Sequence, residues 1–234
     1  MSDHKIGGVA ETMLQTLYAR AKESQKPDHK IYDAKAIEIT SCMDYDFSAA
    51  DRDTAMSSGV IARTIVLDRM VSEFVKEHPA AVVVNIACGM DTRFYRVDNG
   101  ELRWYNIDLP VTMNVRKQYL SEPERVVNIA ASAMDAVWAE QIPEAEIEKP
   151  VLVVIEGLTM YLSESDVQTM LSIISHKFSK VMVFVEILNP KFVKKNIEKS
   201  ISQSGAVFTW GARDGADVAS ICSEFHWNCD YSLV

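Results

Sequence analysis

The stretch from Val82 to Pro110 constrains the fold of this chain more than any other. An apolar run over 82–86 leads into the small-residue turn Ala87-Cys88-Gly89, and a second strand-like run over 102–107 ends in Asp108. Asp108 follows Gly89 by 19 residues, close to the roughly 20-residue spacing at which an acidic residue meets a nucleoside ribose in Rossmann-like folds. This block predicts two adjacent strands whose carboxyl ends hold an adenosine-containing ligand.

Strand-like and helix-like segments alternate along the chain. The predicted strands cover 81–86, 102–107, 125–130, 151–155 and 181–186, and the predicted helices cover 9–24, 33–42, 60–75, 110–120 and 164–177. Three of the strands are apolar on both faces, as in a parallel sheet covered by helices on either side. The alternation predicts an α/β protein with a mostly parallel, doubly wound sheet.

The remaining segments are less regular. We expect an irregular connection over 44–58 and, after Pro190, a helix near 191–202, a strand near 207–210, a helix near 214–224 and a final strand from Phe225. We therefore divide the chain into an N-terminal helical cap (1–58), a Rossmann-like core (59–190) and a C-terminal cap or insert that contains the end of the sheet (191–234).

Composition excludes several classes of protein. The net charge is -9 and no basic stripe dominates, which disfavours a nucleic-acid binder. No apolar run is long enough for a transmembrane helix, and the first residues do not predict a signal peptide. The four cysteines lack framework spacing, which favours a reducing, cytoplasmic setting. Cys222, His226 and Cys229 lack zinc spacing and a fourth ligand, so we expect no metal site.

Acidic residues follow four of the predicted strands. They are Asp108, Asp135, Glu156 and Glu186, and ligands of open α/β sheets bind outside the carboxyl ends of the strands. Asp108 and Asp135 each have an alternative interpretation as helix caps. Glu156 ends a fully apolar strand, where an unpaired carboxylate costs several kcal/mol, so it needs a partner from the protein or from a ligand. Together these groups suit a ligand rich in hydroxyls, amines or positive charge.

Four ordered blocks carry a family resemblance. They are Gly59–Thr64, Val84–Arg96, Tyr105–Pro110 and Glu156–Leu162, and the similarity runs from about residue 9 to 212. In these blocks the chain resembles the leucine carboxyl methyltransferase (LCM) family, which includes bacterial polyketide-type O-methyltransferases and uses S-adenosylmethionine. The resemblance implies a Rossmann-like class I methyltransferase fold with an N-terminal helical cap, with S-adenosylhomocysteine as the product of the cofactor.

By position, the resemblance implies a set of cofactor-binding residues. The set is Lys35, Arg63, Gly89, Asp108, Met134, Asp135 and Glu156. The two basic residues would face the methionine carboxylate, which the planar fork of an arginine matches. The glycine would approach the cofactor backbone, the first aspartate would bind the ribose, and Met134 with Asp135 would hold the adenine. The glutamate would face the amino group or the sulfonium side of the methionine moiety.

The acceptor side is less determined. Asp91, Arg93 and Tyr161 resemble acceptor-side residues, although a hydrogen-bond network that braces the loops explains them equally well. We assign no catalytic residue, because methyl transfer from a sulfonium mainly requires that the nucleophile be held in line and water be excluded. A carboxylate acceptor needs no general base, whereas a hydroxyl acceptor benefits from one.

Two departures from the family pattern matter. Ala87 stands where the family usually has a glycine, and alanine is strained if its φ is positive. We also expect the sheet to lack the last strand, part of the antiparallel hairpin that usually closes such a sheet.

The main functional hypothesis is an S-adenosylmethionine-dependent O-methyltransferase that acts on a small-molecule carboxylate or hydroxyl. One alternative is a methyltransferase of a protein C-terminal carboxylate, and another is a non-catalytic cofactor-binding or interaction protein. A nicotinamide dehydrogenase is distant, because a convincing Gly-x-Gly-x-x-Gly motif is missing. The sequence does not indicate an oligomeric state.

Overall fold

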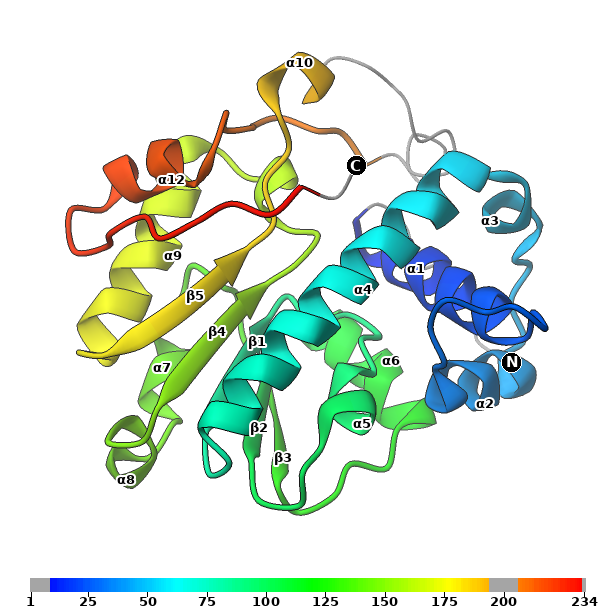
Figure 1. Cartoon of the computed structure of the whole chain (residues 1–234), viewed down its shortest axis with the longest axis horizontal. Coiled ribbons are helices and arrows are strands. Elements are labelled where there is room, and N and C mark those ends of the chain that lie inside the picture. The colour runs from blue at the N-terminus through cyan, green and yellow to red at the C-terminus, as the bar shows by residue number, and fades with distance from the viewer. Residues whose placement is uncertain (1–8, 194–205, 233–234) are drawn as a thin grey trace.

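A parallel sheet of five strands forms the centre of the computed structural model, which describes residues 9–193 and 206–232 (Figure 1). The strands are β1 (Val82–Ile86), β2 (Arg103–Asp108), β3 (Val126–Ala130), β4 (Val151–Ile155) and β5 (Val181–Val185). They lie in the order β3-β2-β1-β4-β5, and all four pairings are parallel. The strand order reverses between β1 and β4, which is the position where such sheets bind ligands at their carboxyl ends.

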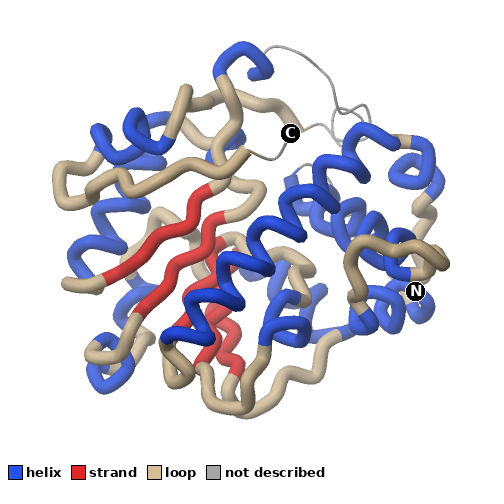
Figure 2. The backbone as a smooth tube through the Cα atoms, viewed as in Figure 1, coloured by secondary structure: helices blue, strands red, loops and turns tan. Residues whose placement is uncertain are grey.

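Helices cover both faces of the sheet, as Figure 2 shows. They are α1 (Val9–Ser24), α2 (Ala34–Cys42), α3 (Ser48–Arg52), α4 (Thr54–Glu77), α5 (Arg93–Val97), α6 (Pro110–Tyr119), α7 (Val137–Glu140), α8 (Glu144–Ile147), α9 (Glu164–Lys177), α10 (Pro190–Val193) and α12 (Gly215–Ile221), with a 3₁₀ turn η1 at Thr159–Tyr161. None of the helices in these described ranges is long and apolar enough to cross a membrane.

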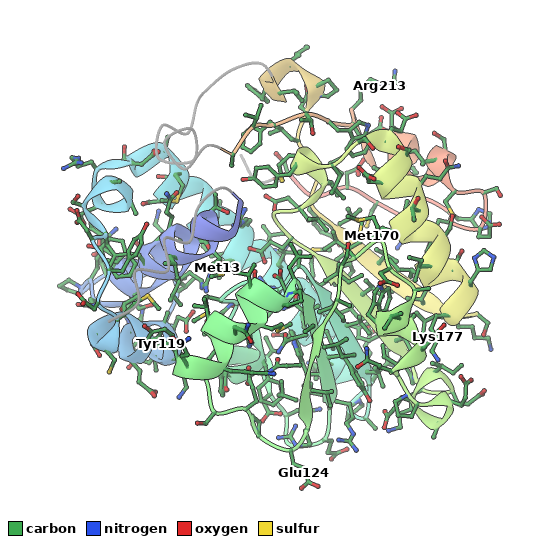
Figure 3. The ribbon with its side chains drawn as sticks, turned by 180° about the vertical axis from the view of Figure 1, so that it is seen from behind. Met13, Tyr119, Glu124, Met170, Lys177 and Arg213 are labelled. Carbon is green, nitrogen blue, oxygen red and sulfur yellow. The ribbon has the colours of Figure 1, made fainter. Side chains whose placement is uncertain are left out.

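The two faces of each central strand enter different hydrophobic clusters. Successive side chains of a strand point to opposite faces of the sheet, so Val82 and Val84 pack with α7 and α9, while Val83 packs with α4 and α5. Met170 of α9, labelled in Figure 3, is fully buried on the first of these faces. Every residue of β1 and β4 is buried, which explains why β4 is apolar throughout and why Asn85 is the one polar residue of β1.

The N-terminal helices pack beside the carboxyl ends of the strands. Met13, Leu14 and Leu17 of α1 form one cluster with Ile39 of α2, and this cluster includes Met90 from the turn after β1. The cap therefore touches the turn on which the sequence predicts a ligand.

The predicted strands and long helices are confirmed within a few residues, but three predictions are wrong. The stretch 44–58, expected to be irregular, holds α3 and the start of α4, because the Asp53 side chain accepts from the Met56 amide and caps α4. No strand forms at 207–210, where the Thr209 amide donates to the Met160 carbonyl of η1 at 2.7 Å instead. The described residues from Phe225 onward also form no strand.

Two other expectations have a different outcome. Of the helix expected near 191–202, only its start in α10 is described, and the rest lies outside the described residues. The division at residues 58 and 190 stays a prediction, and α4 is continuous across the first boundary. β5 is an edge of the sheet, and no antiparallel strand pairs with it in 9–193 or 206–232.

Stability is expected to depend on β4 far more than on β5. Leu152 is fully buried in the middle of β4, whereas Met182 of the edge strand is 42% exposed. Leu152→Ala should lower the free energy of unfolding by about 2–5 kcal/mol through lost burial and a cavity, and Met182→Ala by less than about 1 kcal/mol. Urea denaturation followed by circular dichroism measures both, and equal losses would contradict this assignment of the core.

Candidate cofactor site

A cavity of about 300 Å³ lies at the carboxyl ends of β1 to β4. Its walls come from the turn 87–91 after β1, from Asp108 and Leu109 after β2, from 131–134 after β3 and from 156–158 after β4. Helices α1 and α4 contribute further wall residues, so the cap and the core enclose the cavity together. Of the four acidic residues singled out at the strand ends, Asp108 and Glu156 line this cavity, whereas Asp135 and Glu186 do not.

The turn after β1 contains two left-handed residues. Ala87 has φ +54° and Gly89 has φ +50°, a region that costs an L-residue roughly 1–2 kcal/mol. A Cβ on Gly89 would also lie 3.0 Å from Cβ of Met13, the α1 residue labelled in Figure 3. Backbone and packing thus both favour glycine at 89, and Ala87 carries the strain expected of alanine in a glycine position.

Asp108 joins this turn to the start of α6. Its Oδ2 accepts from the Gly89 amide at 2.8 Å and its Oδ1 accepts from the Leu109 amide at 2.7 Å. Burial raises the pKa of the Asp108 carboxyl, against the opposing effect of these amides. The carboxylate lines the cavity, and its remaining lone pairs are the acceptors available to ligand hydroxyls.

Glu156, at the end of β4, has two arginine partners. Its Oε2 accepts from Arg93 Nη2 at 2.5 Å, and its Oε1 lies 2.8 Å from Arg63 Nε. Burial would raise the pKa of Glu156, but the two guanidinium groups hold it below its usual range. The partner that the sequence required is therefore supplied by the protein, although Glu156 still lines the cavity.

Arg63 lies between two carboxylates. Besides Glu156, its Nη1 lies 3.3 Å from Oε2 of Glu186, which also accepts from the Gly157 amide at 2.7 Å. The Arg63 side chain is 15% exposed and lines the cavity. Positive and negative groups are therefore adjacent on one wall, an arrangement that suits the charged end of an amino acid.

Two of the three acceptor-side candidates line the cavity. Asp91 accepts from Asn85 Nδ2 at 3.0 Å and from the Arg93 amide at 2.9 Å. Tyr161 lines the cavity and packs its ring 5.3 Å from that of Phe208. Arg93 is not a wall residue but is 1% exposed and paired with Asp91, Glu156 and an α4 aspartate. For Arg93 the geometry favours the bracing interpretation.

The structure does not bring every predicted residue to the cavity. Met134 is a wall residue, but Asp135 is not, because its Oδ1 accepts from the Val137 amide at the start of α7. Lys35 lies on α2, where it pairs with Glu38 at 2.7 Å and stands 5.3 Å from the Tyr95 ring centre. The Asp135 carboxylate and the Lys35 ammonium group, which the resemblance assigned to the cofactor, are therefore bound to local partners. The structure does not support either side chain as a cofactor ligand.

None of the individual α1 residues at the cavity was predicted from the sequence. Thr12, Met13, Thr16 and Arg20 all line the cavity, although only an apolar stripe was visible in this helix. Two hydroxyls one turn apart beside that stripe were the available signal. Leu109, which is 49% exposed at the cavity wall, was also missed. Among the described residues, no three His, Cys, Asp or Glu side chains are grouped as a metal site would require.

Replacing Ala87 with glycine should stabilise the protein. Ala87 is the one non-glycine residue with positive φ in 9–193 and 206–232, and relief of this strain should raise the free energy of unfolding by about 1 kcal/mol. Ala133→Gly, at another wall position without positive φ, should instead lower it by about 0.5–1 kcal/mol. Chemical denaturation of the two variants measures whether the free energy of unfolding changes with opposite signs. A lower free energy of unfolding in both variants would contradict backbone strain at Ala87.

Acidification below the ordinary carboxyl pKa should destabilise the fold. The buried Asp33 and the partly buried Asp91 and Glu156 all have lowered pKa values, because arginines outweigh the effect of burial. Their stabilisation is present above the ordinary carboxyl pKa and is lost as pH falls through the lowered values. Asp108 has a raised pKa, so its effect on the pH dependence of stability has the opposite sign. It is one carboxylate against three. The melting temperature should therefore decrease once the pH is below about 4. A melting temperature that stays constant down to about pH 3 would be incompatible with these ion pairs.

Comparisons with known proteins agree with this geometry. The family model described as leucine carboxyl methyltransferase matches residues 13–175. Over 209 residues the chain is 34% identical to the tetracenomycin polyketide synthesis O-methyltransferase TcmP of Streptomyces glaucescens, spanning 88% of this chain and 76% of that relative. Over 228 residues it is 30% identical to the S-adenosyl-L-methionine-dependent methyltransferase dpfgK of Gibberella zeae, with the same two coverages.

One solved structure shows the same fold. A Thermobifida fusca protein assigned to the methyltransferases matches with a TM-score of 0.58 and 14% identity, over 86% of this chain and 73% of that chain. The family match and the two relatives together identify the family of this chain. It belongs to the leucine carboxyl methyltransferase family of S-adenosylmethionine-dependent methyltransferases.

Proposed function

We propose that this chain transfers the methyl group of S-adenosylmethionine to an oxygen of a small-molecule acceptor. The observation that carries the proposal is that Asp108 and the Arg63–Glu156 pair lie on the walls of one strand-end cavity. A carboxylate suits ribose hydroxyls, and adjacent opposite charges suit the amino and carboxyl groups of a methionine moiety. The relative TcmP, named as a polyketide O-methyltransferase, supports a small-molecule acceptor.

The residues present fit this cofactor. Asp108 would hold the ribose, Met134 and Leu109 would contact the adenine, and Arg63 with Glu156 would hold the methionine moiety. Gly89 lets the backbone approach closely, because it carries no side chain. The bound cofactor supplies a methyl group that its positive sulfur already activates. The protein then has to place the acceptor oxygen in line and exclude water.

The cavity favours a carboxylate acceptor over a hydroxyl. Its described walls contain no histidine or lysine. Asp91 and Glu156 are paired with arginines that hold their pKa values low, which makes them weak bases, and burial raises the pKa of the Cys88 thiol. A carboxylate is already ionised at neutral pH and needs no proton acceptor, whereas a hydroxyl gains from one. We therefore propose methyl ester formation.

Cofactor binding is tested by calorimetric titration with S-adenosylhomocysteine. Wild-type protein should bind, and Asp108→Asn should bind about tenfold more weakly, because a charge-assisted hydrogen bond to the ribose is lost. Asp98→Asn is the matched control, since Asp98 pairs with Arg125 away from the cavity walls, and it should bind like wild type. If a well-folded wild-type sample did not bind S-adenosylhomocysteine, the proposal would be wrong.

The acceptor class is tested with cofactor that carries a labelled methyl group. Incubation with cell extract, followed by separation of proteins from small molecules, should place the label among the small molecules. Mild alkali should then release it as methanol, because esters hydrolyse under conditions in which ethers do not. Label in protein would favour a protein carboxylate acceptor instead, and alkali-stable label would show that a hydroxyl is methylated.

A further inference from the structure

Three successive carbonyl oxygens of the turn after β1 accept hydrogen bonds from two buried arginines. Arg116 Nη1 donates to the Gly89 carbonyl at 3.2 Å and to the Asp91 carbonyl at 2.7 Å. Arg20 Nη2 donates to the Met90 carbonyl between them at 2.9 Å. The carbonyls of the turn are therefore held by side chains of α6 and α1.

Arg116 does not itself reach the cavity. Its side chain is 1% exposed and is absent from the cavity walls, whereas Arg20 is one of them. Arg116 Nε donates to Glu122 Oε1 at 2.9 Å, and Arg116 Nη2 lies 2.7 Å from the same oxygen. Glu122 Oε2 in turn accepts from the Tyr95 hydroxyl at 2.6 Å. The guanidinium is thus anchored on one side and holds the turn with the other.

A buried guanidinium is costly unless its partners are all in place. Arg116 meets this condition with a carboxylate and two main-chain carbonyls, so its position leaves little freedom to the turn. The same turn donates the Gly89 amide to Asp108 Oδ2 at 2.8 Å. The orientation of the Asp108 carboxylate at the cavity wall therefore depends on a contact that begins outside the cavity.

We propose that Arg116 is a positioning residue for the cofactor: it fixes the Gly89 and Asp91 carbonyls and thereby the Asp108 carboxylate that faces the ribose. The inference rests on the proposed function, because it takes the strand-end cavity as the cofactor site. Arg116 acts through the turn and touches neither the cofactor nor the acceptor.

The charge of Arg116 has a second effect on Asp108. The groups around this carboxylate are the Gly89 and Leu109 amides, the Thr112 hydroxyl and the Arg116 guanidinium. Two nearby carboxylates, Asp91 and Glu122, are themselves paired with arginines, and the adjacent Cys88 thiol has a pKa that burial raises. Burial raises the pKa of Asp108, and the positive charge of Arg116 opposes that rise.

The test is calorimetric titration with S-adenosylhomocysteine over a series of pH values. Arg116→Lys keeps the positive charge but loses the planar guanidinium that contacts two carbonyls, and Arg116→Gln loses both the charge and the guanidinium. Each variant should therefore bind S-adenosylhomocysteine about tenfold more weakly than wild type at neutral pH. Binding through an ionised Asp108 is complete above its pKa and is lost as pH falls through it. Arg116→Gln should move this loss to higher pH, whereas Arg116→Lys should leave it in place.

Arg125 provides the matched control. It also donates to a main-chain carbonyl, that of Leu102 at 3.0 Å, and to a carboxylate, that of Asp98 at 2.8 Å, but it is not a cavity residue. Arg125→Lys and Arg125→Gln should bind S-adenosylhomocysteine like wild type with the same pH dependence. Should the Arg116 variants fail to fold, Tyr95→Phe, which loosens the Glu122 anchor, should bind about threefold more weakly.

The outcomes separate the two proposals. A wild-type protein that does not bind would overturn the proposed function and this inference with it. Wild-type binding together with unchanged affinity in the folded Arg116 variants would overturn the positioning role alone. A loss of binding stoichiometry at unchanged affinity, in step with the unfolded fraction seen by circular dichroism, would also overturn it. An equal pH displacement in Arg116→Lys and Arg116→Gln would exclude the effect of charge.

Discussion

The structure depends on a buried network of arginines and carboxylates at the carboxyl ends of the strands. Arg93 is its centre: it joins Glu156 at the end of β4, Asp91 in the turn after β1 and Asp68 on α4. Arg96, one turn further along α5, joins Asp68 to the fully buried Asp33 before α2. Removing one member of such a network leaves an uncompensated buried charge at a cost of about 3–5 kcal/mol, so its members hold one another in place.

The network explains how the cofactor site is held in shape. Asp33 also pairs with Arg20 of α1 at 3.0 Å, so the same network joins the cap to the core. Glu156 and Asp91 are wall residues of the cavity, which means that groups on the cavity wall are positioned by charges behind them. A site preorganised in this way undergoes little rearrangement when the ligand binds. The strained backbone of Ala87 lies in the same rigid surroundings, which hold it in its unfavourable conformation.

The sequence predicted the parts of the site that follow from local order along the strands. Gly89, Asp108, Met134 and Glu156 each lie at the end of a strand or in the turn after it. All four line the cavity, because the carboxyl ends of parallel strands meet at one edge. Lys35 was assigned by the resemblance alone, and its side chain pairs with a local partner instead. Asp135 also follows a strand, but its side chain accepts from an amide at the start of α7, in keeping with the alternative interpretation as a helix cap. A network that braces the loops was one of two interpretations of Arg93, but its partners were not predictable: Arg93 and Glu156 are 63 residues apart in the chain, and no local pattern pairs them.

The sequence by itself determined the alternation of strands and helices, the parallel sheet and the family, because hydrophobic periodicity and ordered motifs are local properties of the chain. It also predicted a cofactor with a ribose and an amino-acid end. Only the tertiary structure decided that α1 lines the cavity, that Glu156 is neutralised by protein rather than by ligand, and that Ala87 adopts positive φ. These features depend on contacts between distant segments and on the backbone conformation they impose, which residue order does not record.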